Sequence, residues 1–353
     1  MKQKYHKYFV VLLSVVIFIL PTKYVQAQNH PLSIDEAIIK WQNILVNSTT
    51  QRNVGADPII PVLWKPLFIP ANTSVLDIAI DPTNSAKIFL GTDNASMPVI
   101  YSNDFGRTWI TQTLGLPDAG STILDVDPIS PNYVYVGFRV SEGVYRSDNG
   151  GQTWEAKNNG IISIDGDISA LIVHPITPTL IMAGTASGIP YIYRSENRGE
   201  SWSAIPLTGP NNRTVTQIVV DPHTPSKIYT VVQGEGIFIS TDGGKTWDNS
   251  GIQGSSIAVD PMDPDKLYRI QCELYESGNG GVDWNLVPTP DPCYETLLTD
   301  PFVGNLLYLS SQFRQVTRSA DGGKTWILLD ETLDGNPAPI SSSAFAIDPA
   351  NKN

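Results

Sequence analysis

Cysteine, histidine and positive charge are scarce in this chain of 353 residues. With only two cysteines, Cys272 and Cys293, disulfides cannot be the scaffold, so the hydrophobic core must hold the fold. The four histidines show no metal-ligand spacing, and we expect no metal site and no cofactor. Lysine and arginine number 23 against 35 aspartates and glutamates, a formal net charge of −12. Nucleic acid is therefore excluded as an expected partner, because phosphate backbones select clustered positive charge.

Long hydrophobic runs are also lacking, except for one near the N-terminus. Three lysines precede an apolar run from Phe9 to Leu20, and the small residues Val25 and Ala27 suit a cleavage site. This pattern predicts a signal peptide over residues 1–27 and a secreted or extracytoplasmic mature chain. The run is shorter than the roughly 20 residues of a membrane-spanning helix, so we expect no membrane span after cleavage. In an oxidising compartment the two cysteines are a possible disulfide, which the sequence leaves open.

One eight-residue phrase is present six times: a serine, an Asp or Asn two residues later, a glycine, and a closing tryptophan. Successive tryptophans lie 45, 48, 45, 37 and 42 residues apart, the length of a four-stranded propeller blade. We interpret each copy as a hairpin whose Asp or Asn accepts backbone amides, whose glycine supplies a positive φ, and whose tryptophan starts a strand. These structural residues are Ser102, Asp104, Gly106, Trp109, Ser147, Asn149, Gly151, Trp154, Ser195, Asn197, Gly199, Trp202, Ser240, Asp242, Gly244, Trp247, Ser277, Asn279, Gly281, Trp284, Ser319, Asp321, Gly323 and Trp326.

A second phrase, an Asp-Pro or His-Pro pair after period-two apolar residues, alternates with the first and occurs seven times. Such a phrase is typical of a short strand that runs into a turn. Further strands follow, for example 87–91 and 143–146, which places the tryptophan phrase between a third and a fourth strand. Short strands repeated without intervening helices predict an all-β propeller with six complete four-stranded blades plus an incomplete seventh.

The ends of the repeat predict how the ring closes. Trp64 precedes Asp81 by 17 residues, so residues 61–68 resemble a fourth strand without its own box, which would share a blade with the first strand at 344–348. The second and third strands of that blade are missing, and two explanations stay open: the chain is truncated, or the blade is a two-strand remnant.

Ahead of the propeller, which we expect over residues 59–353, lies a different segment over 28–58. Ser33 and Glu36 form a capping pattern, and Trp41 and Leu45 fall on one face of the helix that follows. We expect a short amphipathic helix and a polar linker.

The phrase Ser-x-Asp-x-Gly-x-Thr-Trp resembles the Asp-box, or BNR, repeat of sialidases, sortilin-type receptor ectodomains, xyloglucan-cleaving glycosidases and photosystem II assembly factors. The resemblance covers about residues 64–353 and implies boxes at the blade periphery that serve structure. The first arginine of the sialidase triad lies in a Phe-Arg-Ile-Pro phrase, which is absent here. Three arginines already precede box serines, so we expect no sialidase site: Arg146, Arg194 and Arg318.

Carboxylates near the expected channel mouth are candidates for catalysis, since propellers bind ligands where the first strands begin. Two carboxylates about 5–9 Å apart can hydrolyse a glycoside. The catalytic candidates are Asp77, Asp125 and Glu295, with Asp165, Asp167 and Gln217 at the same mouth. Each is equally compatible with a solvated loop. The cluster Asp260, Asp263 and Asp265 offers calcium ligands, but its alternating prolines favour a turn.

Strong repetition without a clustered catalytic set favours a secreted, monomeric, non-enzymatic scaffold that binds a protein or glycan through its loops. Two alternatives stay open. One is a glycoside hydrolase, sialidase-like or xyloglucanase-like, with carboxylates at the channel mouth. The other is an assembly factor resembling those of photosystem II.

Overall fold

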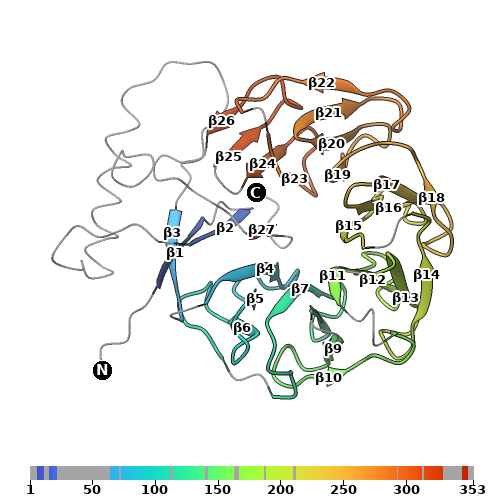
Figure 1. Ribbon diagram of the computed structural model, residues 1–353. Coiled ribbons are helices and arrows are strands. Elements are labelled where there is room, and N and C mark those ends of the chain that lie inside the picture. The colour runs from blue at the N-terminus through green and yellow to red at the C-terminus, as the bar shows by residue number, and fades with distance from the viewer. Residues whose placement is uncertain are drawn as a thin grey trace, which may run out of the picture.

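A computed structural model describes residues 6–11, 16–21, 64–70, 73–111, 114–139, 142–162, 167–186, 188–209, 212–291, 293–311, 314–328 and 344–348. Every regular element in these ranges is a β-strand. Figure 1 shows the sheets set around a central axis, in chain order from β4 to β26. The chain is therefore an all-β six-bladed propeller, which confirms the all-β propeller predicted from the repeat but not its incomplete seventh blade. No helix in the described ranges is long and apolar enough to cross a membrane.

Five of the six blades have four antiparallel strands that pair in chain order. Their bounds are β7 (Ser121–Val126), β8 (Val134–Phe138), β9 (Gly143–Ser147) and β10 (Glu155–Ala156); β11 (Ile168–Val173), β12 (Ile181–Thr185), β13 (Tyr191–Ser195) and β14 (Ser203–Pro206); β15 (Val215–Val220), β16 (Ile228–Val232), β17 (Gly236–Ser240) and β18 (Asp248–Asn249); β19 (Ser256–Val259), β20 (Leu267–Gln271), β21 (Glu273–Ser277) and β22 (Asn285–Val287); β23 (Thr296–Thr299), β24 (Leu307–Ser311), β25 (Arg314–Ser319) and β26 (Ile327–Leu328).

The first blade has three strands, β4 (Val75–Ile80), β5 (Ile88–Thr92) and β6 (Val99–Ser102). The prediction of a complete fourth strand is wrong for this blade, because among the described residues pairing beyond β6 is a single bridge between Tyr101 and Ile110. A few residues later the chain turns to the next blade, where the carbonyl of Leu114 accepts a 2.9 Å hydrogen bond from the amide of Trp154. That contact draws the segment away from β6.

A further four-stranded sheet joins the two ends of the chain in the order β27, β2, β1, β3. Its strands are β1 (His6–Val11), β2 (Val16–Pro21), β3 (Trp64–Ile69) and β27 (Ala344–Ile347). The strand expected at 61–68 is β3, and it shares a sheet with β27 as expected. The places between them, expected to be empty, hold β1 and β2, whose valine-, isoleucine- and phenylalanine-rich sequences suit paired strands. The signal peptide and the seven-bladed plan stay predictions, and the expected helix at 33–45 lies outside the described residues.

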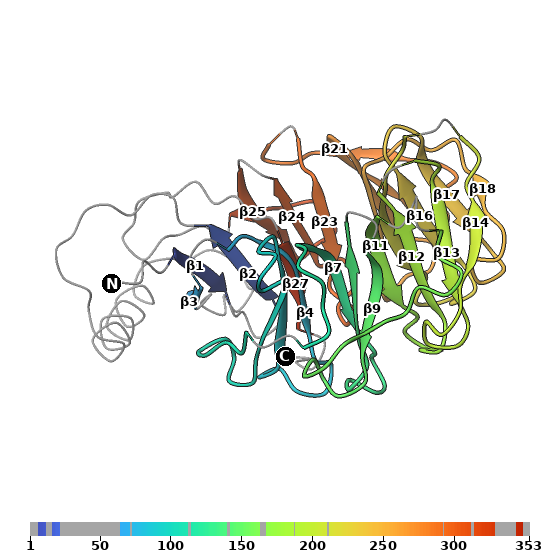
Figure 2. The ribbon, with the colours of Figure 1, turned by 60° about the horizontal axis from the view of Figure 1, so that its bottom comes forward.

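The first strands of the blades surround the axis and contact one another in chain order from β4 through β7, β11, β15 and β19 to β23 (Figure 1). We call the side where these strands begin the entry face, and the opposite side the box face. The box face carries the turn between the first two strands of each blade, which is tied to the box of the same blade. For example, the amide of Gly150 donates to the carbonyl of Asn132 at 2.8 Å. Figure 2 shows the strands running between the two faces.

Each box is organised around a buried serine. In the second blade, the Ser147 hydroxyl donates to Asn149 Oδ1 at 2.9 Å and accepts from the amide of Gly151 at 2.8 Å. Asn149 Oδ1 also accepts from the amide of Thr153 at 2.9 Å. The ring of Trp154, which follows, packs in a cluster with Phe89 and other residues of the preceding blade. The box thus fixes a tight turn and places the tryptophan between blades.

Candidate functional site

Asp77 and Asp125 lie on the neighbouring first strands β4 and β7. Asp77 Oδ2 accepts a 2.7 Å hydrogen bond from the amide of Leu124 on β7. Asp125 Oδ2 accepts a 2.8 Å bond from the amide of Val173 on β11, while its Oδ1 accepts from the amide of Val126 at 2.8 Å. Each carboxyl group therefore joins its own blade to the following one.

Polar side chains continue this seam around the axis. Gln217 Oε1 on β15 accepts a 2.9 Å hydrogen bond from the amide of Ile257 on β19. On β11, the Ser169 hydroxyl donates to the carbonyl of Val215 on β15 at 2.7 Å. Short polar side chains thus satisfy backbone groups where one inner strand meets the next, and an unpaired buried amide there would be costly.

Burial raises the pKa of Asp77 to about 7, against the opposing effect of backbone hydrogen bonds from Leu124 and Ile78. Burial likewise raises the pKa of Asp125 to about 6, although the amides of Val173 and Val126 favour its charged form. The two carboxyl groups consequently exchange protons close to neutral pH. A carboxyl group that keeps its proton near neutrality is also what a general acid requires.

Asp125, the fifth of the six residues of β7, stands nearer the box face than the entry face. The other candidates expected at the entry face are dispersed. Glu295 is exposed and stands just before β23, which packs on β19, whereas β4 packs on β7 and β27. The structure therefore does not gather Glu295 with Asp77 and Asp125. Asp167 precedes β11, where its carbonyl accepts from the amide of Ala186 at 2.8 Å, and Asp165 lies outside the described residues.

Sequence reasoning passed over the exposed carboxylate of Asp93 on the entry face. Asp93 directly follows β5, and its Oδ1 accepts a 2.6 Å hydrogen bond from the amide of Ser74, just ahead of β4. It belongs to no repeated phrase. Only the pairing of β4 with β5, in which Val75 lies opposite Thr92, shows that it stands at the entry face.

The cluster Asp260, Asp263 and Asp265 forms a turn. Asp260 Oδ1 accepts from the amides of Met262 and Asp263, at 2.9 and 3.2 Å, and its Oδ2 accepts from the amide of Asn305 at 2.6 Å. Asp263 Oδ1 accepts from the amide of Asp265 at 3.1 Å. In the part of the chain that the structure describes, no three His, Cys, Asp or Glu side chains are grouped to hold a metal ion.

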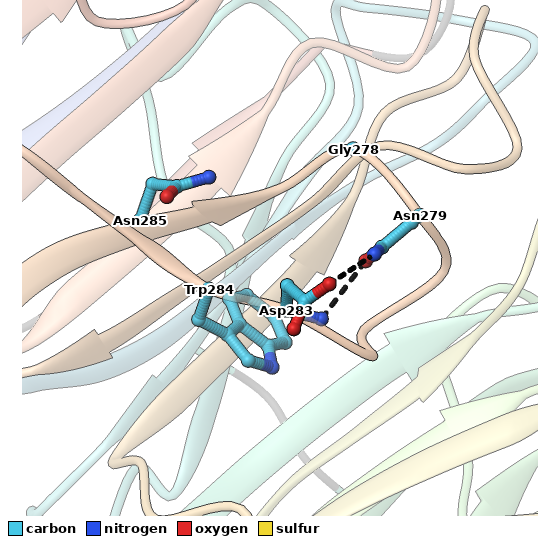
Figure 3. A pocket seen from close by; sticks show the side chains of 5 residues that line it. All are labelled: Gly278, Asn279, Asp283, Trp284 and Asn285. Atoms are coloured by element: carbon cyan, nitrogen blue, oxygen red, sulfur yellow. Dashed lines mark hydrogen bonds between the residues drawn. The ribbon is translucent and has the colours of Figure 1, made fainter.

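An open hollow at the surface lies against the box of the fifth blade (Figure 3). Its lining comprises Gly278, Asn279, Asp283, Trp284 and Asn285. Asn279 Nδ2 donates to Asp283 Oδ2 at 2.8 Å, and the amide of Asp283 donates to Asn279 Oδ1 at 2.9 Å. The polar groups of this hollow thus hold the box turn, and we assign it no ligand.

Cys272 and Cys293 are joined in a disulfide with a Cα–Cα distance of 4.2 Å. The bond ties the hairpin between β20 and β21 to the segment that leads into β23. Cys272 has a φ of +63° at the tip of this hairpin. Because disulfides persist in oxidising compartments, the bond is consistent with an extracytoplasmic protein.

The sequence profile of the BNR/Asp-box repeat matches residues 145–156 and 238–249, which are the boxes of the second and fourth blades with their flanks. With the six blades and their serine-centred turns, this match defines a BNR/Asp-box repeat β-propeller. The chain is related to the xyloglucanases. It is 24% identical over 294 residues to the xyloglucanase of Hypocrea jecorina (strain QM6a), an alignment that covers 72% of this chain and 32% of that enzyme. The chain thus spans about a third of the length of this relative.

Solved structures share the fold. The GH74 xyloglucanase from Xanthomonas campestris has a TM-score of 0.58 at 18% identity, covering 78% of this chain and 47% of that enzyme. YCF48 from Cyanidioschyzon merolae has a TM-score of 0.55 at 16% identity, covering 74% of this chain and 86% of YCF48. A structure of YCF48 bound to D1 peptide has a TM-score of 0.50 at 14% identity, covering 70% and 78% of the two chains. The same architecture thus occurs in enzymes and in a peptide-bound protein.

Proposed function

We propose that the chain is a non-enzymatic propeller scaffold that binds a protein or glycan outside the cytoplasm. The observation that carries this proposal is the bonding of Asp125, whose two carboxyl oxygens both accept backbone amides. Asp77 makes the same kind of bond to the following blade. Carboxyl groups fixed in this way hold blades together and are not free to exchange protons with a substrate in the required geometry.

Two further observations support the proposal. The disulfide between Cys272 and Cys293 suits an oxidising compartment. YCF48 has the same fold and is seen with a bound peptide, which favours a polypeptide as one class of ligand for this chain as well.

The test is a binding screen with the full chain on a glycan array and a synthetic peptide array, followed by recovery of the bound ligands. We expect saturable binding to one of the two classes, with the ligand recovered at its original mass. Recovery of a shortened glycan or peptide would overturn the non-enzymatic proposal.

The second candidate function is glycoside hydrolysis, and one observation favours it. Asp77 and Asp125 lie on the adjacent first strands β4 and β7, and their raised pKa values suit a general acid. The similarity to xyloglucanases points to xyloglucan as a substrate. A screen of aryl β-glycosides with the wild type and with Asp77→Asn and Asp125→Asn tests it, since turnover that disappears in either folded variant would favour the enzyme. The assembly-factor alternative rests on fold likeness alone, so we do not propose it.

A further inference from the structure

The box face carries apolar side chains at repeated positions around the axis. In each blade a turn joins the first strand to the second. The turn begins with the Asp-Pro or His-Pro pair, and its third residue comes directly after that pair. Exposed apolar side chains stand there in three blades and one position later in the sixth: Ile129 (61% exposed), Ile176 (64%), Met262 (62%) and Val303 (48%). We call these four residues the turn ring. Single exposed apolar residues are ordinary, so the observation of interest is their recurrence at equivalent sites of one face.

The turn ring is held rigidly by the buried residue that begins each turn. Asp127 Oδ1 accepts a 2.9 Å hydrogen bond from the amide of Ile129. Asp300 Oδ1 accepts from the amide of Val303 at 3.0 Å, and His174 Nδ1 accepts from the amide of Ile176 at 3.3 Å. Because these turns are already ordered, a partner that binds them incurs little of the usual cost of ordering loops.

Neighbouring turns are also bonded to one another. His174 Nε2 lies 2.9 Å from the carbonyl oxygen of Pro225 in the fourth turn, and His223 Nε2 lies 2.9 Å from the carbonyl oxygen of Asp260 in the fifth. Asp260 Oδ2 accepts a 2.6 Å bond from the amide of Asn305 in the sixth. The third to sixth turns therefore form one continuous surface.

Charge on this surface indicates what covers it. Asp263 and Asp265 adjoin Met262, and both are exposed. Within the described residues neither carboxylate makes an ion pair. The neighbouring cation, Lys266, instead has its Nζ 3.7 Å from Glu276 Oε2. An apolar surface beside two carboxylates is complementary to a partner that carries aliphatic side chains next to a lysine or arginine. The net charge of −12 of the chain also attracts a positively charged partner at long range. Glycans lack both groups.

We infer that the turn ring, with Asp263 and Asp265, binds an extended basic polypeptide segment in which aliphatic side chains alternate with lysine or arginine. This deepens the proposed function and rests on its protein-binding form. The aliphatic side chains pack on Ile176 and Met262, and the cation pairs with Asp263 or Asp265. Methionine suits such a contact because its flexible side chain adapts to different partners.

The test uses three fluorescent 12-residue peptides: one alternating leucine and lysine, one with glutamate for lysine, and one with serine for leucine. Fluorescence anisotropy measures the dissociation constant with the full chain. We expect binding of the leucine–lysine peptide only. The double variant Ile176→Ser/Met262→Ser should weaken binding of the leucine–lysine peptide at least tenfold. The double variant Asp263→Asn/Asp265→Asn should weaken this binding severalfold at low salt and reduce its salt dependence. All these side chains are exposed, so the melting temperature should stay near that of the wild type.

Val282→Ser is the matched control, since Val282 is 78% exposed on the box of the fifth blade but outside the turn ring. It should leave the dissociation constant unchanged. The inference is overturned by absence of binding, by equal binding of the glutamate peptide, or by turn-ring variants that bind like the wild type. If a ligand found on the arrays binds the turn-ring variants as it binds the wild type, the turn-ring inference fails but the proposed function stands. If the chain turns over a substrate, the proposed non-enzymatic function fails, and this result does not test the turn ring.

Discussion

The carboxyl group of Asp77 accepts a 2.7 Å hydrogen bond from the backbone amide of Leu124 and thereby ties the first blade to the second. Asp125 repeats this arrangement between the second and third blades. The residues that best fit a catalytic pair by position are thus part of the structural seam around the axis. This relationship leads to the pH dependence below.

Stability should fall as pH rises through the range in which these two groups titrate. The folded pKa values, about 7 for Asp77 and about 6 for Asp125, exceed the ordinary value of 3.8, so the folded chain binds more protons than the unfolded chain at intermediate pH. Their contribution to stability is therefore complete below about pH 4 and is lost as pH rises through about 6 and 7. Urea denaturation of Asp77→Asn/Asp125→Asn at pH 5 and pH 8 should show a smaller decline than the wild type. Exposed Asp118→Asn is the control, and an undiminished decline in the double variant would contradict the assignment.

The box serines should contribute measurably to stability. Ser147 is fully buried, and its hydroxyl bonds both to the side chain of Asn149 and to the amide of Gly151. Ser147→Ala leaves these groups unsatisfied, which should lower the free energy of unfolding by roughly 1–3 kcal/mol. Ser203→Ala, at an exposed serine on β14, should change it little. Equal effects of the two substitutions in chemical denaturation would argue against the box as a stabilising turn.

Two boxes place a residue other than glycine at a position with positive φ, and they should respond differently to glycine. Arg198, at φ +59°, bonds through Nη1 to fully buried Asp127 and lies over the ring of Tyr133. Phe105, at φ +61°, is 45% exposed. Arg198→Gly should cost roughly 2–3 kcal/mol, because Asp127 Oδ2 loses its charged partner while only Oδ1 keeps its backbone amides. Phe105→Gly relieves backbone strain of about 1 kcal/mol and should change stability by no more than that. Thermal denaturation of both variants checks this, and a stable Arg198→Gly variant would contradict it.

Removal of the disulfide should destabilise the fifth and sixth blades. The bond between Cys272 and Cys293 closes a loop of 21 residues, which corresponds to about 3 kcal/mol. Cys272→Ala/Cys293→Ala should therefore unfold at lower denaturant concentration, and reduced wild type should behave like the variant. Detection of two free thiols in the purified native chain by mass spectrometry would refute the bond.

The propeller is predictable from sequence because tryptophan spacing and Asp-Pro turns are local signals that recur. Ser147 and Gly151 carry their roles within eight residues of chain, so the box turn can be inferred without knowledge of the rest of the fold. The missing fourth strand of the first blade was not predictable, because it depends on the bond between Leu114 and Trp154 of the next blade.

The site was harder to predict for the same reason. Asp77 and Asp125 could be assigned to first strands from the repeat, but Asp125 is the fifth residue of β7 and lies toward the box face. The partners of the two carboxyl groups are amides 47 and 48 residues away. No sequence pattern states which amide lies opposite. The turn ring was likewise not predictable from the sequence. An Asp-Pro or His-Pro pair predicts a turn, but it does not predict that Ile176 and Met262 are exposed on the same face.

The most direct test of the central claim is release of reducing ends from xyloglucan by the purified chain and by Asp77→Asn/Asp125→Asn, both shown to be folded by circular dichroism. The scaffold account predicts that neither protein releases reducing ends above the enzyme-free background. Turnover by the wild type that is abolished in a folded double variant would contradict it and would make these carboxyl groups catalytic.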